Sequence, residues 1–395
     1  MPVAATELGR GGPRVSSVGL GLMGMSGVYG PADETESKAT IRAALDAGVT
    51  LLDTGDFYGM GHNELLLRDA LRGIDRSSVF IQVKFGGQRD PRGAFIGHDA
   101  SPAMVKSSLA YSLTRLGTDY IDLYQPARLD GHVPIEETVG AIAEMIEAGY
   151  VRYLGLSEMG ADTIRRAAAV HPVTSLQIEY SLMSRGIEDR ILPAVRELGV
   201  GITAYGIMSR GLLSADSARA IGPGDPRSRF PRFSGENLRR NIGLVTALEQ
   251  VAASRGVTTA QLAIAWVLSR GADIVPLIGT KRRSRLAEAL GALDLTLSPD
   301  ELAAIEAAVP SAQVAGDRYD AAQMAALDSE KPYGNGTGSA SRAAVRSLGL
   351  PVTGRDGRTA GRCLTGTAGC PPVAAAWCQR LRAPAGRRRG RPGSP

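Results

Sequence analysis

The feature that most constrains the fold is an alternation between short apolar runs and longer segments of helical periodicity. Strands that alternate with helices predict a parallel sheet covered by helices. Eight alternations over roughly 300 residues indicate that the sheet closes into an α/β fold of the (β/α)8 TIM-barrel type, rather than staying open and doubly wound. The eight runs are VGLGL (18–22), VTLLD (49–53), VFIQVK (79–84), IDLYQ (121–125), VRYLGLS (151–157), LQIEY (176–180), GITAY (201–205) and IVPLIG (274–279).

Three helical stretches carry clear end signals. Residues 33–48 (DETESKATIRAALDAG) have acids in the first turn, which complement the helix dipole, and end at Gly48. Residues 101–117 begin with Ser-Pro and residues 134–149 begin with Pro, and both stretches end in Gly. By contrast, GLGLMG (19–24) matches a dinucleotide-binding pattern, but MSGVYGPAD follows instead of a helix. We therefore expect these glycines to serve close packing at a strand end.

Composition divides the chain at Glu330, which predicts a barrel domain over 1–330 and a tail over 331–395. The first part holds 33 bases and 39 acids, and the tail holds twelve bases and one acid. The net charges are therefore −6 and +11, so the basic overall charge does not indicate nucleic-acid binding by the barrel. The tail is rich in Gly, Arg and Pro, which predicts disorder; a polybasic partner-binding arm is the alternative. The irregular segment 212–238 is either a lid or a surface excursion.

Several classes of function are excluded or disfavoured for the barrel domain. All three cysteines lie in the tail, so the barrel has no disulfide, no thiol nucleophile and no sulfur metal ligand, and we predict no metal site. The N-terminus lacks an apolar signal region, and no apolar run approaches the ~18 residues needed to span a bilayer. The sequence predicts a cytoplasmic protein that binds neither membrane nor nucleic acid, and it implies no particular oligomeric state.

Polar residues at strand ends indicate the site, because barrel active sites lie at the C-terminal ends of the strands. Asp53 ends the second run, Tyr58 follows on its loop, and Lys84 ends the third. A lysine in so apolar a strand requires a carboxylate partner, and Asp53 is the obvious one. The positive charge is expected to lower the pKa of Tyr58 and poise it for proton transfer. The alternative is a structural ion pair beside a coincidental tyrosine.

A second candidate site is the basic segment GTKRRSRLAEAL, 279–290. Four cations, Lys281, Arg282, Arg283 and Arg285, lie in or next to the first turn of its predicted helix. Cations there oppose the helix dipole, which suggests a bound anion such as a nucleotide 2′-phosphate, with Arg285 as the bidentate ligand. A solvated basic face is the alternative.

These motifs together resemble the aldo-keto reductases in order and spacing over about residues 6–330. The resemblance rests on LLDTGDFYGMGHNELLLRDAL, VKFG, GLSE, LQIEYSLMSR and IVPLIGTKRRSRLAEAL. It implies a barrel that reduces a small-molecule aldehyde or ketone with NADPH, with Tyr58 as general acid tuned by Lys84 and Asp53. It also implies the cofactor contacts. Ser157, Glu158 and Gln177 would hold the carboxamide, Tyr180 would stack on the nicotinamide, the loop with Tyr205, Gly206, Arg210 and Gly211 would surround the pyrophosphate, and Thr280, Lys281, Arg285 and Glu288 would bind the adenosine part.

The chain departs from the family pattern at three positions. Glu158 and Ala289 stand where asparagine is usual, and Ala127 stands where the fourth strand usually delivers a histidine. Gln125, two residues earlier on the same strand face, is the economical substitute donor, and His98 and His132 on loops are alternatives. The missing histidine resembles the pyridoxal-reductase-like branch, which implies an aromatic aldehyde substrate. It equally resembles the β subunits of potassium channels, which would make the protein a cofactor-binding regulator.

Overall fold

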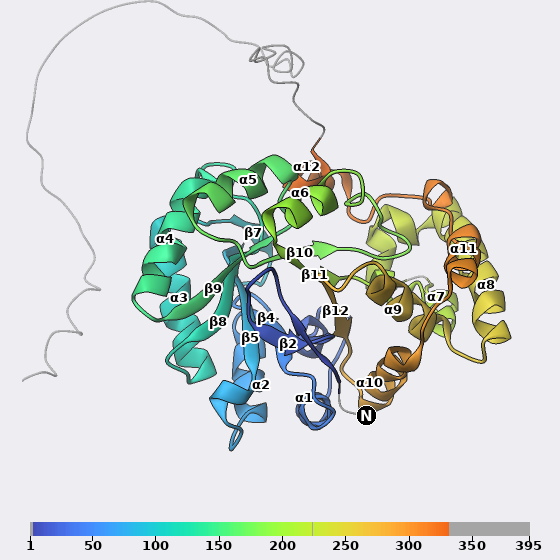
Figure 1. Ribbon diagram of the computed structural model, residues 1–395, viewed down its shortest axis with the longest axis horizontal. Coiled ribbons are helices and arrows are strands. Elements are labelled where there is room, and N and C mark those ends of the chain that lie inside the picture. The colour runs from blue at the N-terminus through green and yellow to red at the C-terminus, as the bar shows by residue number, and fades with distance from the viewer. Residues whose placement is uncertain (1–2, 223, 332–395) are drawn as a thin grey trace, which may run out of the picture. The chain divides into compact units, whose positions relative to one another are not determined.

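The computed structural model describes residues 3–222 and 224–331, so the predictions for the tail lie outside the described residues except at Lys331. Eight parallel strands close into a barrel, in the spatial order β3, β4, β5, β8, β9, β10, β11, β12 and back to β3 (Figure 1). All eight predicted strands and the predicted (β/α)8 fold are confirmed. The strands are β3 Gly19–Gly21, β4 Leu51–Gly55, β5 Phe80–Phe85, β8 Ile121–Pro126, β9 Val151–Ser157, β10 Ser175–Glu179, β11 Gly201–Tyr205 and β12 Ile274–Gly279.

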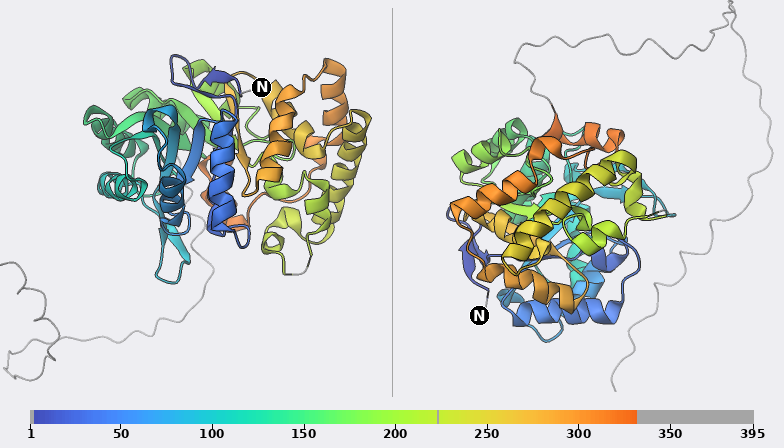
Figure 2. Two further views of the ribbon diagram at one scale, coloured as in Figure 1. Left: turned by 90° about the horizontal axis from the view of Figure 1, so that it is seen from below. Right: turned by 90° about the vertical axis from the view of Figure 1, so that its right-hand side faces the viewer.

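Helices surround the strands on the outside of the barrel (Figure 2). Their bounds are α1 Glu34–Asp46, α2 His62–Ala70, α3 Pro102–Leu116, α4 Ile135–Glu147, α5 Ala161–Val170, α6 Ile191–Leu198, α7 Ala215–Arg219, α8 Gly235–Ser254, α9 Thr259–Ser269, α10 Arg283–Leu290, α11 Pro299–Ala308 and α12 Ala321–Ala326. The predicted end signals are present: Asp33 caps the backbone N–H of Glu36, and Gly117 ends α3 in the left-handed conformation. The predicted irregular segment 212–238 contains α7 and two short 3₁₀ helices, and its Phe230 and Phe233 are buried.

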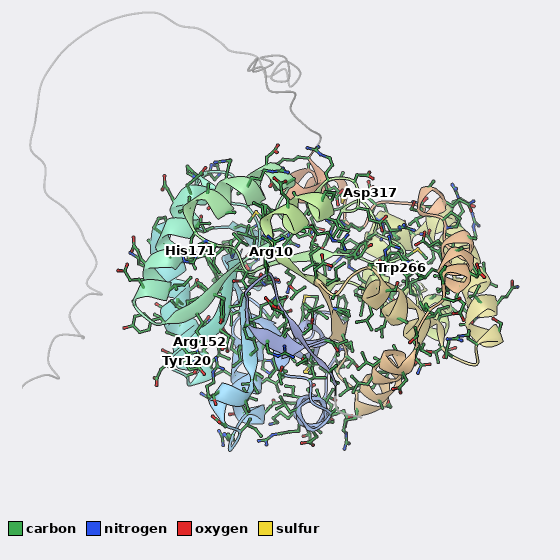
Figure 3. The ribbon with its side chains drawn as sticks, viewed as in Figure 1. Arg10, Tyr120, Arg152, His171, Trp266 and Asp317 are labelled. Atoms are coloured by element: carbon green, nitrogen blue, oxygen red, sulfur yellow. The ribbon has the colours of Figure 1, made fainter. Side chains whose placement is uncertain are left out.

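The floor of the barrel is apolar and is plugged by a hairpin of β1 Ala5–Glu7 and β2 Arg14–Ser16. Leu8 after β1 and Val15 of β2 pack against inward side chains of the strands, namely Leu51, Phe80, Leu123, Val275 and Leu277. Gly19 is required here, because a Cβ would lie 2.5 Å from Leu51 Cδ2 and 2.6 Å from Leu277 Cδ2. This confirms the packing interpretation of GLGLMG. A small cavity at this end is lined by Arg10, Arg152 and His171 (Figure 3).

Two excursions from the barrel position the candidate site. The hairpin of β6 Gly87–Arg89 and β7 Phe95–His98 lies between β5 and α3. The C-terminal segment, defined here as residues 311–331, runs from α8 to the end of β9: Asn241 on α8 donates to the carbonyl of Ala315, and the backbone N–H of Ser329 donates to the carbonyl of Glu158. This segment therefore passes over the C-terminal ends of the strands.

Within the described ranges, no single helix has the length and apolar character needed to cross a bilayer. Only α8 and α9 taken together reach that threshold, and they are bent by 88° at the break between them.

Candidate active site

The centre of the site is a buried ion pair between neighbouring strands. Parallel pairing places Gly55 of β4 opposite Lys84 of β5. Lys84 Nζ lies 2.5 Å from Asp53 Oδ1, and the two side chains are 4% and 6% exposed. The carboxylate also accepts hydrogen bonds from Gln82 Nε2 at 3.2 Å and from Gln177 Nε2 at 2.7 Å. The expected partner of Lys84 is present, and Gln177 is brought into the same cluster, where it contacts Asp53.

Tyr58 lies on the loop after β4 and is buried. Lys84 Nζ is 5.1 Å from the centre of its ring, and Phe57 packs edge-on against it at 4.9 Å. Burial raises the pKa of the Tyr58 hydroxyl well above its usual value, the charge of Asp53 adds to this, and the charge of Arg128 works in the other direction. The predicted lowering of this pKa is therefore wrong. Lys84 is neutralised by Asp53, so burial dominates and Tyr58 stays protonated.

The end of β8 carries no histidine. Ala127 is buried, and Gln125 faces the barrel interior opposite Lys84. Both polar side-chain atoms of Gln125, Nε2 and Oε1, are buried without a hydrogen-bond partner among the described residues. His98 ends β7, and burial together with the charge of Arg128 lowers its pKa to about 4, so it is neutral at pH 7. His132 lies on the following loop, where its backbone N–H donates to Asp130.

A second ion pair lies at the end of β9, and no sequence pattern indicated it. Arg318 of the C-terminal segment contacts both oxygens of the buried Glu158 carboxylate, at 2.9 Å and 2.5 Å. Tyr205 and Ser329 hydroxyls donate to the same carboxylate, each at 2.7 Å. Burial alone would raise the pKa of Glu158, but Arg318 outweighs it and holds the pKa at about 2. Because both oxygens of this carboxylate already have partners, neither is free to accept a hydrogen bond from a carboxamide, which was the predicted role of Glu158.

Tyr205, and not Tyr180, is the tyrosine that lies next to Glu158 at this end of the barrel. Side chains alternate along a strand, so Gln177 and Glu179 point inward and Tyr180 points outward. Tyr180 is fully buried against Trp266 of α9 (labelled in Figure 3), and its hydroxyl donates to Glu188. The predicted stacking residue is therefore not brought to the site. The period-two pattern of LQIEY was the signal that could have shown that Tyr180 lies on the opposite face of the strand from Gln177.

The loop after β11 is strained. Gly206, Ser209, Arg210 and Gly211 all have positive φ, between 43° and 87°. Such conformations are costly for Ser and Arg and concentrate at ligand sites. Arg210 donates to the carbonyl of Arg318 and lies over the rings of Phe230 and Tyr319. The expected loop is thus present at the strand ends, with its arginine held by the C-terminal segment.

The basic segment after β12 leads into α10. Lys281 donates to the carbonyls of Gly30 and Pro31, and Arg283 pairs with Glu36. Arg285 pairs with Glu288 at 2.6 Å on the exposed face of the same helix, so these two predicted cofactor contacts touch each other. The Thr280 hydroxyl bonds locally to the carbonyl of Arg282. The segment thus presents three exposed arginines, Arg282, Arg283 and Arg285, next to a helix N-terminus that has no side-chain cap.

Orphaned polar atoms fit a bound group in the barrel. Ser157 Oγ, Gln125 Nε2 and Gln125 Oε1 are buried and lack partners within the described part of the chain. Leaving such atoms unpaired costs about 1–3 kcal/mol each. A ligand amide such as the nicotinamide carboxamide supplies a donor and an acceptor, which matches this set. No cluster of His, Cys, Asp or Glu able to hold a metal occurs in the described ranges.

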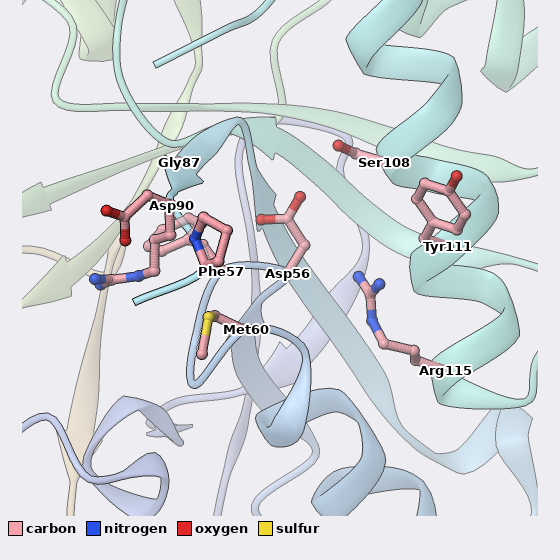
Figure 4. A pocket seen from close by; sticks show the side chains of 10 residues that line it. Asp56, Phe57, Met60, Gly87, Asp90, Ser108, Tyr111 and Arg115 are labelled. Atoms are coloured by element: carbon pink, nitrogen blue, oxygen red, sulfur yellow. The ribbon is translucent and has the colours of Figure 1, made fainter. Parts of the chain in front are cut away.

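A separate pocket of about 430 Å³ lies beside the loop after β4, and its lining includes Phe57 but neither Tyr58 nor Lys84. Figure 4 shows Asp56 at its centre, with Ser108 and Arg115 approaching from α3. Asp56 Oδ1 is buried without a partner among the described residues. Burial, and then the charge of Glu64, raise the pKa of Asp56 to about 7. This carboxyl differs from Asp53 and Glu158 because no cation of the described part of the chain is bonded to it.

Comparisons with known proteins agree with this geometry. The model of the aldo/keto reductase family matches residues 17–310. "Probable aldo-keto reductase 1" of Glycine max is 42% identical over 323 residues, which cover 80% of this chain and 92% of that protein. The solved structure of a glycerol dehydrogenase from Gluconobacter oxydans is similar with a TM-score of 0.70 at 27% identity, covering 78% of this chain and 96% of that chain. The protein therefore belongs to the aldo/keto reductase family and is an NADP-dependent oxidoreductase.

Proposed function

We propose that the protein reduces an aldehyde to an alcohol, with Tyr58 as the proton donor to the carbonyl oxygen. The observation that carries this proposal is the buried ring of Tyr58 at 5.1 Å from Nζ of Lys84, which belongs to the buried Lys84–Asp53 pair. When bound, the nicotinamide cofactor supplies a hydride to the carbonyl carbon. As Tyr58 gives up its proton, the cation of Lys84 faces the developing phenolate, and Asp53 holds that cation in place.

The cofactor contacts belong to the same proposal. Ser157 Oγ is the free donor and acceptor for the carboxamide, and Tyr205, which faces inward next to Glu158, is the aromatic neighbour of the ring. The strained loop 206–211 binds the pyrophosphate, and Arg285 with Lys281 binds the 2′-phosphate. To bind the 2′-phosphate, Arg285 must leave Glu288. Because the 2′-phosphate is present in NADPH and absent from NADH, Arg285→Ala should weaken NADPH binding by about 1.5–3 kcal/mol and leave NADH binding nearly unchanged. Fluorescence titration with both cofactors measures this, and equal weakening would exclude the role.

Gln125 replaces the histidine in the proposed site. Its amide is the unpaired donor closest along the strand to Ala127, and it lies opposite Lys84. We propose an aromatic aldehyde, such as pyridoxal, as the substrate, because the absence of the histidine is shared with the pyridoxal-reductase-like branch.

The domain division at Glu330 and a cytoplasmic location also remain proposals from the sequence.

The second candidate function is a cofactor-binding regulator with little turnover, and Ala127 is the observation that favours it. Both candidates require NADPH binding, so binding does not separate them. The deciding experiment follows NADPH oxidation with a panel of aromatic and aliphatic aldehydes. Turnover that depends on the aldehyde supports the reductase. Tight NADPH binding without turnover on any aldehyde supports the regulator.

A further inference from the structure

The mouth of the barrel concentrates positive charge. Four arginines gather there from distant parts of the chain, with three glutamates as their partners. Arg318 pairs with Glu158, with Glu179 at 3.2 Å and with Glu330 at 2.8 Å. Arg210 and Arg232 approach the same Glu179, at 3.9 Å and 3.7 Å. The fourth arginine is Arg128.

Arg128 differs from the other three because no carboxylate lies within 4 Å of it in the described part of the chain. Its guanidinium donates to the adjacent carbonyl of Ala127 at 2.6 Å and to the hydroxyl of Tyr319 at 3.5 Å. A guanidinium has five N–H donors, so these two neutral acceptors leave donors free. The negative charge that acts on Arg128 is that of Glu158, which lies beyond 4 Å and is already paired with Arg318. Residues 1–330 have a net charge of −6. Arg128 therefore adds a positive charge to the mouth of a domain whose net charge is negative.

The position of Arg128 places it beside the proposed proton donor. It follows Ala127 directly after β8, and β8 pairs with β5, which carries Lys84. Its charge acts on the hydroxyl of Tyr58 and on Lys84. The segment 280–288, which is the proposed site of the 2′-phosphate, follows β12 on the other side of the barrel. The loop 206–211 lies nearer, because Arg210 packs over the ring of Tyr319, whose hydroxyl accepts from Arg128, so NADPH affinity is measured as well.

Resting on the proposed reduction, we infer that Arg128 anchors an anionic group of the substrate, so that the preferred carbonyl compound carries a carboxylate or a phosphate near its aldehyde. A planar guanidinium binds either anion with two parallel hydrogen bonds. The anion replaces the hydroxyl of Tyr319 as a partner of Arg128. The contact between the anion and the guanidinium then holds the aldehyde beside Tyr58, which is the proton donor.

The test compares substrates that differ only in charge. We measure kcat/KM with NADPH for 4-carboxybenzaldehyde and its methyl ester, methyl 4-formylbenzoate, and for pyridoxal 5′-phosphate and pyridoxal. The first pair probes a carboxylate and the second a phosphate. The readout is the preference, defined as the ratio of kcat/KM within each pair, because a general loss of activity cancels in this ratio.

We expect the wild type to prefer the anionic member of at least one pair. In Arg128→Leu that preference should fall about 10- to 100-fold, the range for one charged hydrogen-bonding partner, mainly through KM. Arg128→Lys should recover part of it, because the charge returns without the planar fork. The matched control is Arg152→Leu, on β9 at the opposite end of the barrel, which should leave the preference unchanged.

Three results would overturn the inference: no preference in the wild type, equal losses for both members of each pair in Arg128→Leu, or a loss of NADPH affinity as large as the loss of preference. If Arg128→Leu does not fold, the same comparison is made with Arg128→Lys. If no aldehyde is turned over, the proposed function fails separately. Calorimetric titration of the NADPH complex with 4-carboxybenzaldehyde and its ester then decides: binding that requires both the carboxylate and Arg128 supports the anchor, and equal binding of the two excludes it.

Discussion

Two buried ion pairs lie at the same end of the barrel, and they differ in how the chain brings the partners together. Lys84 and Asp53 come from neighbouring strands and are 31 residues apart. Arg318 and Glu158 are 160 residues apart, and they meet only because the C-terminal segment passes over the strand ends. The first pair is bonded by the amides of Gln82 and Gln177, and the second by the hydroxyls of Tyr205 and Ser329.

The two pairs therefore have different expected roles: the first acts in proton transfer, and the second holds the C-terminal segment over the strand ends. The first pair faces the ring of Tyr58, so its cation can respond when that residue loses a proton. The second pair ties down the segment that carries Tyr319, and its carboxylate has a pKa of about 2, which leaves it ionised at every physiological pH. Because both pairs are buried, we expect damage to either to lower stability, but only damage to the first should also lower kcat directly.

The largest expected effect follows from breaking the first pair. Lys84→Met removes the cation that stabilises the Tyr58 phenolate and leaves Asp53 as a buried anion beside it. We expect kcat to fall by at least about 100-fold, within the range for general acid–base groups. The control is Lys106→Met on α3, where the half-exposed lysine pairs with Glu144, and its kcat should not change. Retention of more than a tenth of the activity in Lys84→Met would contradict the assignment.

Breaking the second pair should instead lower stability. Arg318→Met leaves the Glu158 carboxylate buried without its cation, which costs about 3–5 kcal/mol of unfolding free energy. Adding Glu158→Gln should restore much of this, because the uncompensated charge is removed as well. Urea unfolding of the two single variants and the double variant measures the coupling. A loss below about 1 kcal/mol in Arg318→Met would mean that the C-terminal segment is held by other contacts.

A third carboxyl, the half-buried Asp56, sharpens the comparison because no cation is bonded to it among the described residues. Its pKa is raised to about 7, so folding favours the protonated form, and the stability this gives is lost as pH rises from about 4 to about 7. Glu158 behaves oppositely, losing stability only as pH falls toward 2. Asp56→Asn should therefore match the wild type near pH 4 and exceed it by about 2–4 kcal/mol at pH 8. Unfolding at both pH values checks the sign.

The smallest effect is expected at the proposed domain boundary. A chain ending at Glu330 keeps Arg318 and the partners that the structure describes for it. Among the described side-chain contacts it loses the ion pair between the half-exposed Lys331 and Asp328, worth about 0–1 kcal/mol. Its melting temperature and NADPH affinity should match those of the full chain. A chain ending at Gly316 lacks Arg318 and serves as the destabilised comparison. A fall of several degrees for the chain ending at Glu330 would place the boundary later than that residue.

The predictability of the two pairs from sequence follows from the same difference. Strand patterning determined the barrel, and a lysine ending an apolar strand required a partner one strand away, so Lys84 and Asp53 were found. The direction of the Tyr58 pKa was missed because the charge of Lys84 was considered without its neutralisation by Asp53. Arg318 lies in a polar stretch, VAGDRYDAA (314–322), with no strand or helix period. Its approach to Glu158 depends on the path of the whole C-terminal segment, which no local pattern encodes.

The role of Tyr58 as proton donor, with the cofactor held by other residues, is tested most directly by Tyr58→Phe. The substitution removes one hydroxyl and keeps the ring that packs against Phe57 and Lys84. NADPH oxidation with the best aldehyde and NADPH binding by fluorescence are measured on the same preparation. We predict that oxidation falls to background while the dissociation constant changes less than about three-fold. Aldehyde reduction within ten-fold of the wild type would contradict this role.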